Sequence, residues 1–212
     1  MILGVDFDNT IICYDSVFHK VALEQGVIPA DLARHKGAVR DYLRRIGQED
    51  IWTEMQGYVY GRRLGDCEPF PGVIPFFRTC RGNGLEVLII SHKTRHPYLG
   101  PKYDLHEAAA AWLETQGFFD PAGLNLPRAS VFFELTKEEK LRRIAACDCD
   151  YFIDDLPEFL TEPDFPSQVT RLLFDPAEAY DQAPSYRRVR SWAEIQDVFG
   201  QWLGWNQRGT VV

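Results

Sequence analysis

Short apolar runs rich in β-branched and aromatic residues recur along the chain and are typical of strands buried in a parallel sheet. We expect five such strands, at Ile2–Asp6, Glu86–Ser91, Ser130–Glu134, Asp150–Asp154 and Val169–Phe174. Helical patterns separate most of them; the clearest are Leu105–Gly117, Thr136–Ala146 and Ser191–Leu203, and Asp175-Pro176 is expected to begin one more. Strands that alternate with helices predict an α/β fold in which helices flank a parallel sheet.

One interval interrupts this alternation. The chain between the first and second predicted strands is far longer than a crossover connection needs. Residues 15–68 have helical patterns throughout, and a cluster of Pro and Gly residues follows them. We therefore divide the chain into an α/β core of residues 1–14 and 69–205, a helical insertion at 15–68, and a loosely held C-terminal tail at 206–212.

Composition places the chain among ordinary globular proteins. It has 212 residues, of which 45% are hydrophobic and 25% charged, enough for one sizeable core and a small extra module. No apolar run is long enough to cross a bilayer, and the first apolar run is broken by Asp6 and Asp8, which excludes a signal peptide. The five cysteines are scattered and odd in number, so they predict no disulfide framework. We expect a cytoplasmic protein that has no membrane partner.

The net charge of the chain disfavours some classes of binding partner. The formal net charge is -8, whereas nucleic-acid binding needs clustered Lys and Arg, so we expect no nucleic-acid partner. A small anionic substrate remains compatible with this charge, because a metal ion and a few local cations can reverse the field inside a crevice.

Acidic residues follow two of the predicted strands. Asp6 and Asp8 end the first strand, and Asp154 and Asp155 end the fourth. Because ligands of open parallel sheets bind beyond the carboxyl ends of the strands, these four side chains are expected to share one crevice. Carboxylates this close repel one another unless a cation lies between them or one of them is protonated, and either state suits catalysis. Clustered carboxylate oxygens favour a hard cation, so the sequence predicts a Mg²⁺ site.

Hydroxyl and ammonium groups follow the two intervening strands. Ser91 ends the second strand, where its hydroxyl can donate to a phosphate oxygen. Lys137 opens the helix after the third strand, where a cation opposes the helix dipole, which suggests that it serves the site. Lys140, one helical turn later, is the alternative. Lys93 and Arg95 lie in a cationic stretch after Ser91 that we expect to rim the crevice, where both are candidates for substrate contact.

Together these groups resemble the four motifs of the haloacid dehalogenase-like superfamily, in the right order and each after a predicted strand. They are Asp6-Phe7-Asp8-Asn9-Thr10, Ser91, Lys137 and Asp154-Asp155. The match spans residues 1–175 and implies a Rossmann-like core, with the insertion at 15–68 as a C1-type cap over the crevice.

The same resemblance assigns a role to each group. It makes Asp6 the nucleophile and Asp8 the general acid and base. Ser91 and Lys137 would bind phosphate, and Asp154 with Asp155 would complete a Mg²⁺ site to which Asp6 and Asp8 also contribute.

The resemblance also implies an activity. It predicts a Mg²⁺-dependent phosphohydrolase that acts on a small phosphorylated metabolite through an aspartyl-phosphate intermediate. The family's true dehalogenases lack the second aspartate of the first motif, so the presence of Asp8 favours phosphoryl chemistry. Two alternatives stay open: a phosphotransferase or mutase that uses the same residues, and a catalytically silent binding protein that keeps the fold.

Overall fold

The computed structural model describes residues 1–205, and a six-stranded sheet in which all neighbouring strands are parallel forms its centre. The spatial order is β5-β4-β1-β6-β7-β8. The bounds are Ile2–Val5 for β1, Glu86–His92 for β4, Val131–Glu134 for β5, Tyr151–Asp154 for β6, Thr170–Phe174 for β7 and Arg187–Val189 for β8. The predicted α/β fold with a parallel sheet is confirmed. The tail at 206–212 lies outside the described residues.

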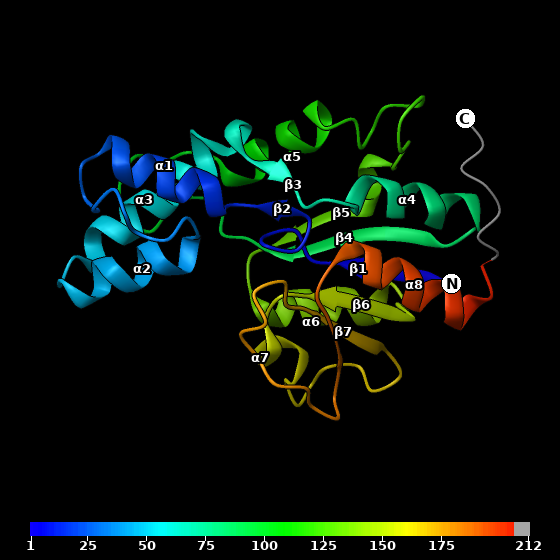
Figure 1. Cartoon of the computed structure of the whole chain (residues 1–212). Helices are drawn as coiled ribbons and strands as arrows, with labels where there is room; N and C mark the ends of the chain where they lie inside the picture. The colour runs from blue at the N-terminus through cyan, green and yellow to red at the C-terminus, as the bar shows by residue number, and fades with distance from the viewer. Residues whose placement is uncertain (206–212) are drawn as a thin grey trace.

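Helices cover both faces of the sheet (Figure 1). One face carries α4 (Val73–Gly82), α5 (Leu105–Thr115) and α8 (Trp192–Leu203), and the other carries α6 (Lys137–Ala146) and the short α7 (Pro157–Leu160). Successive strand residues point to opposite faces. In β4, Ile89 therefore packs with the first group of helices, and Leu88 and Ile90 pack with the second. Burial on both faces explains why the strands have continuous apolar sequences.

The direction of chain progression reverses at β1. The next two strands, β4 and β5, lie on one side of β1, and the last three lie on the other. Val5, the last residue of β1, is in register with Ile89 of β4 and with Ile153 of β6. Ligands of such sheets bind beyond the carboxyl ends of the strands at this reversal point. The residues directly after Val5 therefore lie where a ligand is expected.

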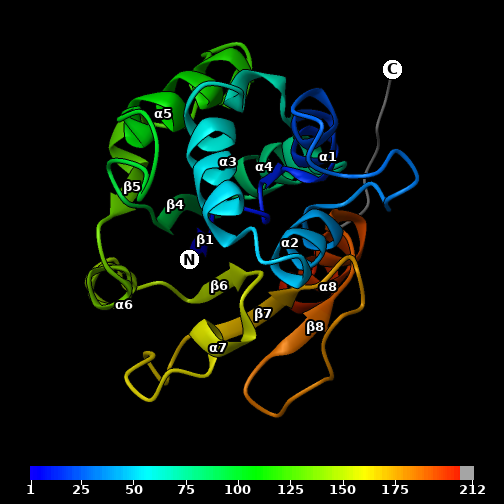
Figure 2. The same ribbon diagram turned by 90° about the vertical axis from the view of Figure 1, so that its left-hand side faces the viewer.

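The insertion consists of three helices, α1 (Asp15–Glu24), α2 (Lys36–Arg45) and α3 (Glu49–Gly61), followed by a 3-10 turn at Leu64–Asp66. A two-stranded antiparallel sheet of β2 (Ile12–Cys13) and β3 (Glu68–Pro69) brings its two ends together next to the core. Figures 1 and 2 show the three helices grouped beyond one end of the large sheet. The residues that follow β1 lie at this same end of the sheet, because only a short segment separates the end of β1 from the start of α1. No helix in residues 1–205 is long and apolar enough to cross a membrane.

The segment after β7 differs from the expected structure. Asp175-Pro176 does not begin a helix; turns follow instead. The Asp175 carboxylate accepts hydrogen bonds from the backbone N–H groups of Ala179 (2.9 Å) and Tyr180 (3.0 Å). Glu178 has a φ of 52°, in the left-handed region that a helix cannot use. Asp175 therefore binds the amides of a loop. Aspartate before proline is common in such turns as well as at the start of a helix.

Candidate functional site

Three carboxylates meet at the carboxyl ends of β1 and β6. One oxygen from each of Asp6, Asp154 and Asp155 lies within 4.8 Å of the others. Asp6 follows β1 directly, and its backbone N–H donates to the carbonyl of Ile153 (2.9 Å) in β6. Because these two strands are hydrogen-bonded parallel neighbours, the side chains that follow them lie at the same edge of the sheet and share one crevice.

Burial makes this cluster electrostatically costly. Burial raises the pKa of Asp6; Asp154 and Asp8 act in the same direction, and Lys140 opposes them. Burial also raises the pKa of Asp155, assisted by Asp154 and Asp6. A divalent cation among the three oxygens would favour their ionised forms. Hard carboxylate oxygens grouped in this way fit a magnesium ion.

The lysine that reaches the cluster is Lys140, and the expectation for Lys137 is corrected. Lys140 Nζ lies 2.7 Å from Asp6 Oδ1 and 2.6 Å from Asp154 Oδ2, and its side chain is 3% exposed. Lys137 has a side chain that is 46% exposed and lies 3.5 Å from Glu162. Although burial alone would lower the pKa of Lys140, Asp154 and Asp6 raise it, so this lysine stays charged.

Helix geometry explains this difference of one turn. The Thr136 hydroxyl caps α6 by accepting from the Glu139 amide, so Lys137 is the first helical residue and extends past the packed face. Lys140 lies on the buried face of α6, and its ammonium is 4.1 Å from the centroid of the Phe159 ring. The cap residue fixes where the helix begins, but not which turn faces the carboxylates.

Asp8 is held apart from the three clustered carboxylates. Its two carboxylate oxygens lie 2.8 and 2.7 Å from Lys93 Nζ, and the Tyr14 hydroxyl donates to one of them. Burial alone would raise the pKa of Asp8, but Lys93, through its charge and hydrogen bonds, lowers it. The Lys93 side chain is 3% exposed and the Asp8 side chain 22%, so the lysine is shielded from water while the carboxylate stays partly accessible. Lys93, a candidate for substrate contact, is thus paired with a carboxylate of the protein itself.

Arg95, the other candidate after Ser91, points away from the carboxylates. Its side chain is 59% exposed and its guanidinium lies 2.8 Å from Asp104, the N-cap residue of α5. Both cations proposed for the rim, Lys93 and Arg95, are therefore paired with a carboxylate of the protein.

Ser91 lies inside the crevice with an unused hydroxyl. The residue is 1% exposed, and its Oγ has no hydrogen-bond partner among the described residues. A buried hydroxyl without a partner destabilises a fold by roughly 1–3 kcal/mol, so one in a native structure calls for an explanation, such as a catalytic role or a bound water or ion. A phosphate oxygen would complete its hydrogen bonding.

The turn after β1 is shaped to present Asp6 and Asp8. The Phe7 carbonyl accepts from the amides of Ile11 (3.0 Å) and Ile12 (3.2 Å), and Asn9 has a φ of 55°. Asparagine is among the few non-glycine residues that tolerate this left-handed conformation. The indole N–H of Trp192 in α8 donates to the Thr10 carbonyl (3.1 Å) and anchors the turn from the core side.

One residue of the site was missed by sequence reasoning. Lys36, the first residue of α2, extends from the insertion to the turn after β1, where its Nζ lies 3.3 Å from Asn9 Oδ1. In the sequence it is one of several basic residues in an amphipathic segment. Nothing in its local pattern indicates that the insertion folds back over the crevice.

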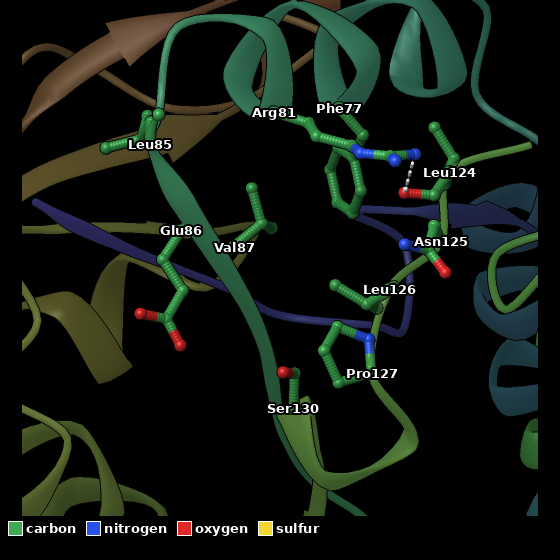
Figure 3. Close-up of a pocket in the computed structure, with 11 residues that line it drawn as sticks. Phe77, Arg81, Leu85, Glu86, Val87, Leu124, Asn125, Leu126, Pro127 and Ser130 are labelled. Carbon is green, nitrogen blue, oxygen red and sulfur yellow. Dashed lines mark hydrogen bonds between the residues drawn. The ribbon is translucent and has the colours of Figure 1, made fainter. Parts of the chain in front are cut away.

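A separate cavity of about 330 Å³ lies at the opposite end of β4 (Figure 3). It is mainly apolar, with Phe77, Leu85, Val87, Leu124, Leu126 and Pro127 among its lining residues. Arg81 also lines it, but its guanidinium donates to the Leu124 carbonyl (3.3 Å). Since the cavity surrounds the first residues of β4 and Ser91 is near the last, the two sites are distinct.

Comparison with known proteins gives a likeness of structure only. No protein-family model matches the chain, and no curated protein sequence matches it. A haloacid dehalogenase-like family hydrolase from Xanthomonas campestris superposes with a TM-score of 0.55 at 13% identity, over 95% of each chain. A HAD family hydrolase from Deinococcus radiodurans, solved with bound phosphate and sodium, gives 0.55 at 14% identity, over 94% of each chain.

A third structure is named as a phosphatase. The HAD phosphatase from Thermococcus onnurineus superposes with a TM-score of 0.51 at 15% identity, over 93% of this chain and 97% of its own. These likenesses extend over almost the whole of each chain, including the helical insertion. The protein therefore has the fold of the haloacid dehalogenase-like hydrolases, the family whose motifs its sequence resembles.

Proposed function

We propose that this protein is a Mg²⁺-dependent phosphohydrolase that acts on a small phosphate monoester through an aspartyl-phosphate on Asp6. One observation carries the proposal: the buried Lys140 ammonium bridges Asp6 and Asp154, and an oxygen of Asp155 lies within 4.8 Å of both carboxylates. A reactive carboxylate held between a fixed cation and further acidic ligands suits attack on a phosphoryl group.

In the first step, an Asp6 oxygen attacks phosphorus, and the bond between phosphorus and the ester oxygen breaks. The leaving oxygen takes a proton from Asp8 and departs as an alcohol. Lys93 lowers the pKa of Asp8 in the free protein. A phosphate dianion next to Asp8 acts in the opposite direction, which favours the protonated form that this step requires.

In the second step, a water molecule attacks the phosphorus of the aspartyl-phosphate. Asp8 takes a proton from that water, the bond between Asp6 and phosphorus breaks, and inorganic phosphate leaves. Lys93 and the Tyr14 hydroxyl, both bound to the Asp8 carboxylate, would hold it in place through the two proton transfers.

The charge that develops on the transferred group needs fixed partners. Lys140 supplies an ammonium, and the unpartnered Ser91 hydroxyl supplies a donor. Asp6, Asp154, Asp155 and the backbone carbonyl of Asp8 would hold Mg²⁺, which, when bound, supplies positive charge to the phosphoryl oxygens.

The substrate is proposed to be a small metabolite, not a polymer. The helices of the insertion lie beyond the end of the sheet that carries Asp6 and Asp8 (Figure 2), and Lys36 extends from them to the turn after β1, so we expect the insertion to cover the crevice. A covered crevice and a net charge of -8 both disfavour a polynucleotide.

The experiment is phosphate release from an aryl phosphate, with and without Mg²⁺. We expect release that stops with EDTA and is abolished in Asp6→Asn, because an amide of the same shape is not a nucleophile. Measuring free phosphate also separates hydrolysis from transfer to a second alcohol. Full activity of Asp6→Asn, with native thermal stability, would refute the mechanism.

A further inference from the structure

The Lys36 ammonium lies in a box of aromatic rings above the turn that carries Asp8. Its Nζ is 5.4 Å from the ring centroid of Tyr14, 5.6 Å from that of Phe18 and 5.4 Å from that of Tyr60. Aromatic faces attract a cation at these distances. The backbone of Lys36 is fixed independently, since its N–H donates to Asp15 Oδ1 (2.9 Å). Its side chain therefore reaches the crevice from a rigid base.

Lys36 differs from the other two lysines of the crevice in its charge partners. Lys140 is paired with Asp6 and Asp154, and Lys93 with Asp8. Within residues 1–205, Lys36 has no carboxylate at ion-pair distance; its polar partners are Asn9 Oδ1 and Tyr60. An ammonium has three donors, so at least one is left for another acceptor.

This lysine is nevertheless charged. Burial alone would lower the pKa of Lys36, but Tyr60 and, through space, Asp155 and Asp8 outweigh burial and raise it. Lys36 is partly buried, and a cation that is shielded from water without a contacting anion is unfavourable unless something else supplies the negative charge. An anionic group of a bound molecule would do so.

The position of Lys36 indicates which part of a substrate it meets. Its hydrogen-bond partner Asn9 directly follows Asp8, the residue proposed to protonate the leaving oxygen. The groups proposed to hold the phosphoryl oxygens, Lys140 and Ser91, come from the core and not from the insertion. Lys36 therefore faces the leaving-group side of the crevice.

From this arrangement we infer that Lys36 binds a second anionic group, carried on the leaving portion of the substrate. The substrate class is then a small phosphate monoester that also bears a carboxylate or a second phosphate. This inference rests on the proposed function and deepens it by naming the feature that the insertion selects.

A binding experiment tests the inference without turnover. In the presence of Mg²⁺, calorimetry compares 3-phosphonopropionate with propylphosphonate, two non-hydrolysable phosphonates that differ mainly in a carboxylate. Because a hydrogen bond to a charged group contributes about 1.5–3 kcal/mol, the wild-type protein should prefer the carboxylated probe by roughly 10-fold or more. Methylenediphosphonate, compared with methylphosphonate, tests a second phosphate in the same way.

Lys36→Met is the matched variant, since methionine keeps the apolar stem and packs well against aromatic rings. It should remove the preference and leave the affinity for propylphosphonate unchanged. Lys36→Gln is a second variant with a polar end, in case the first is poorly folded. Lys20→Met is the control: Lys20 belongs to the same insertion but is largely exposed, near Asp66 (3.8 Å), and its loss should leave the preference intact.

Three results would overturn the inference. If the wild-type protein binds both members of each pair equally, or binds none of the probes while it hydrolyses the aryl phosphate, there is no second anion site. If Lys36→Met weakens both members of a pair equally, Lys36 binds the phosphoryl group itself. If the preference survives in both Lys36 variants, Lys36 is only structural. Failure of the proposed function is distinct from all three: the probes would bind with the expected preference, but the aryl phosphate would not be hydrolysed.

Discussion

Lys93 holds both carboxylate oxygens of Asp8, at 2.8 and 2.7 Å, across 85 positions of sequence. The pair joins the end of β4 to the turn after β1, and Tyr14, which precedes α1, donates to the same carboxylate. The Asp8 carboxylate thus connects the end of β4 to Tyr14, the residue directly before the insertion.

The first prediction concerns this pair. Lys93→Met should lower kcat by about 10- to 100-fold, since Asp8 loses the group that positions it. Lys93 lowers the pKa of Asp8, so its removal should raise that pKa. The protonated form, which the first step requires, would then persist to a higher pH, and the basic limb of the kcat/KM profile should move to higher pH. Arg95→Met, which removes an exposed cation two residues away, should leave both quantities unchanged.

The second prediction ranks the two lysines of α6. Lys140→Met should lower kcat/KM by about 100-fold or more, because it removes a cation that contacts the proposed nucleophile. Lys137→Met should change it by less than about threefold, since Lys137 is half exposed and lies near Glu162. The reverse ranking, measured on proteins with similar melting temperatures, would return the role to Lys137.

The sequence was most informative where local pattern and tertiary position coincide. Strands buried on both faces are continuous apolar runs, and all five predicted strands agree with the structure to within one residue at each end. In the six-stranded sheet, the strand that the sequence did not reveal is β8, whose sequence Arg187-Arg188-Val189 contains no such run. Its pairing comes from the neighbouring β7, which no local pattern shows.

The candidate site divides in the same way. Residues that end a strand, such as Asp6 and Asp154, follow from topology, because neighbouring parallel strands deliver them to one edge. The positions of Lys140 and Lys36 cannot be predicted from topology, since they depend on how a helix or a whole insertion packs against that edge. Lys93 appeared as a candidate for substrate contact, and only the structure shows that it is paired with Asp8.

The third prediction concerns the acidic cluster. Mg²⁺ that binds the folded protein stabilises it by about 2.7 kcal/mol at a concentration 100 times the Kd. Adding millimolar Mg²⁺ should therefore raise Tm, and Asp155→Asn should reduce that rise, because it removes one of the three grouped carboxylates. Asp164→Asn, at an exposed position, is the control and should keep the full rise. An identical response of all three proteins to Mg²⁺ would argue against a site at Asp155.

The last prediction tests how closely the insertion packs on the core segment after β4. A Cβ added at Gly61 of α3 would lie 2.4 Å from Tyr103 Cβ, whereas one added at Gly200 of α8 would meet no atom within 4 Å. Gly61→Ala should destabilise the protein by about 1–3 kcal/mol through overpacking. Gly200→Ala should stabilise it by roughly 0.5–1 kcal/mol, because alanine loses less backbone entropy in a helix.

For a chain of this length, each kcal/mol corresponds to about 2–4 °C in Tm. The same substitution should thus shift Tm downward at Gly61 and upward at Gly200, in thermal melts followed by circular dichroism. Overpacking at Gly61 also pushes the insertion away from the crevice, so Gly61→Ala should raise KM for the substrate more than it lowers aryl phosphate turnover. A Gly61→Ala protein as stable as the wild type would mean that α3 and the segment around Tyr103 move apart freely, and that the insertion is not held over the crevice by this contact.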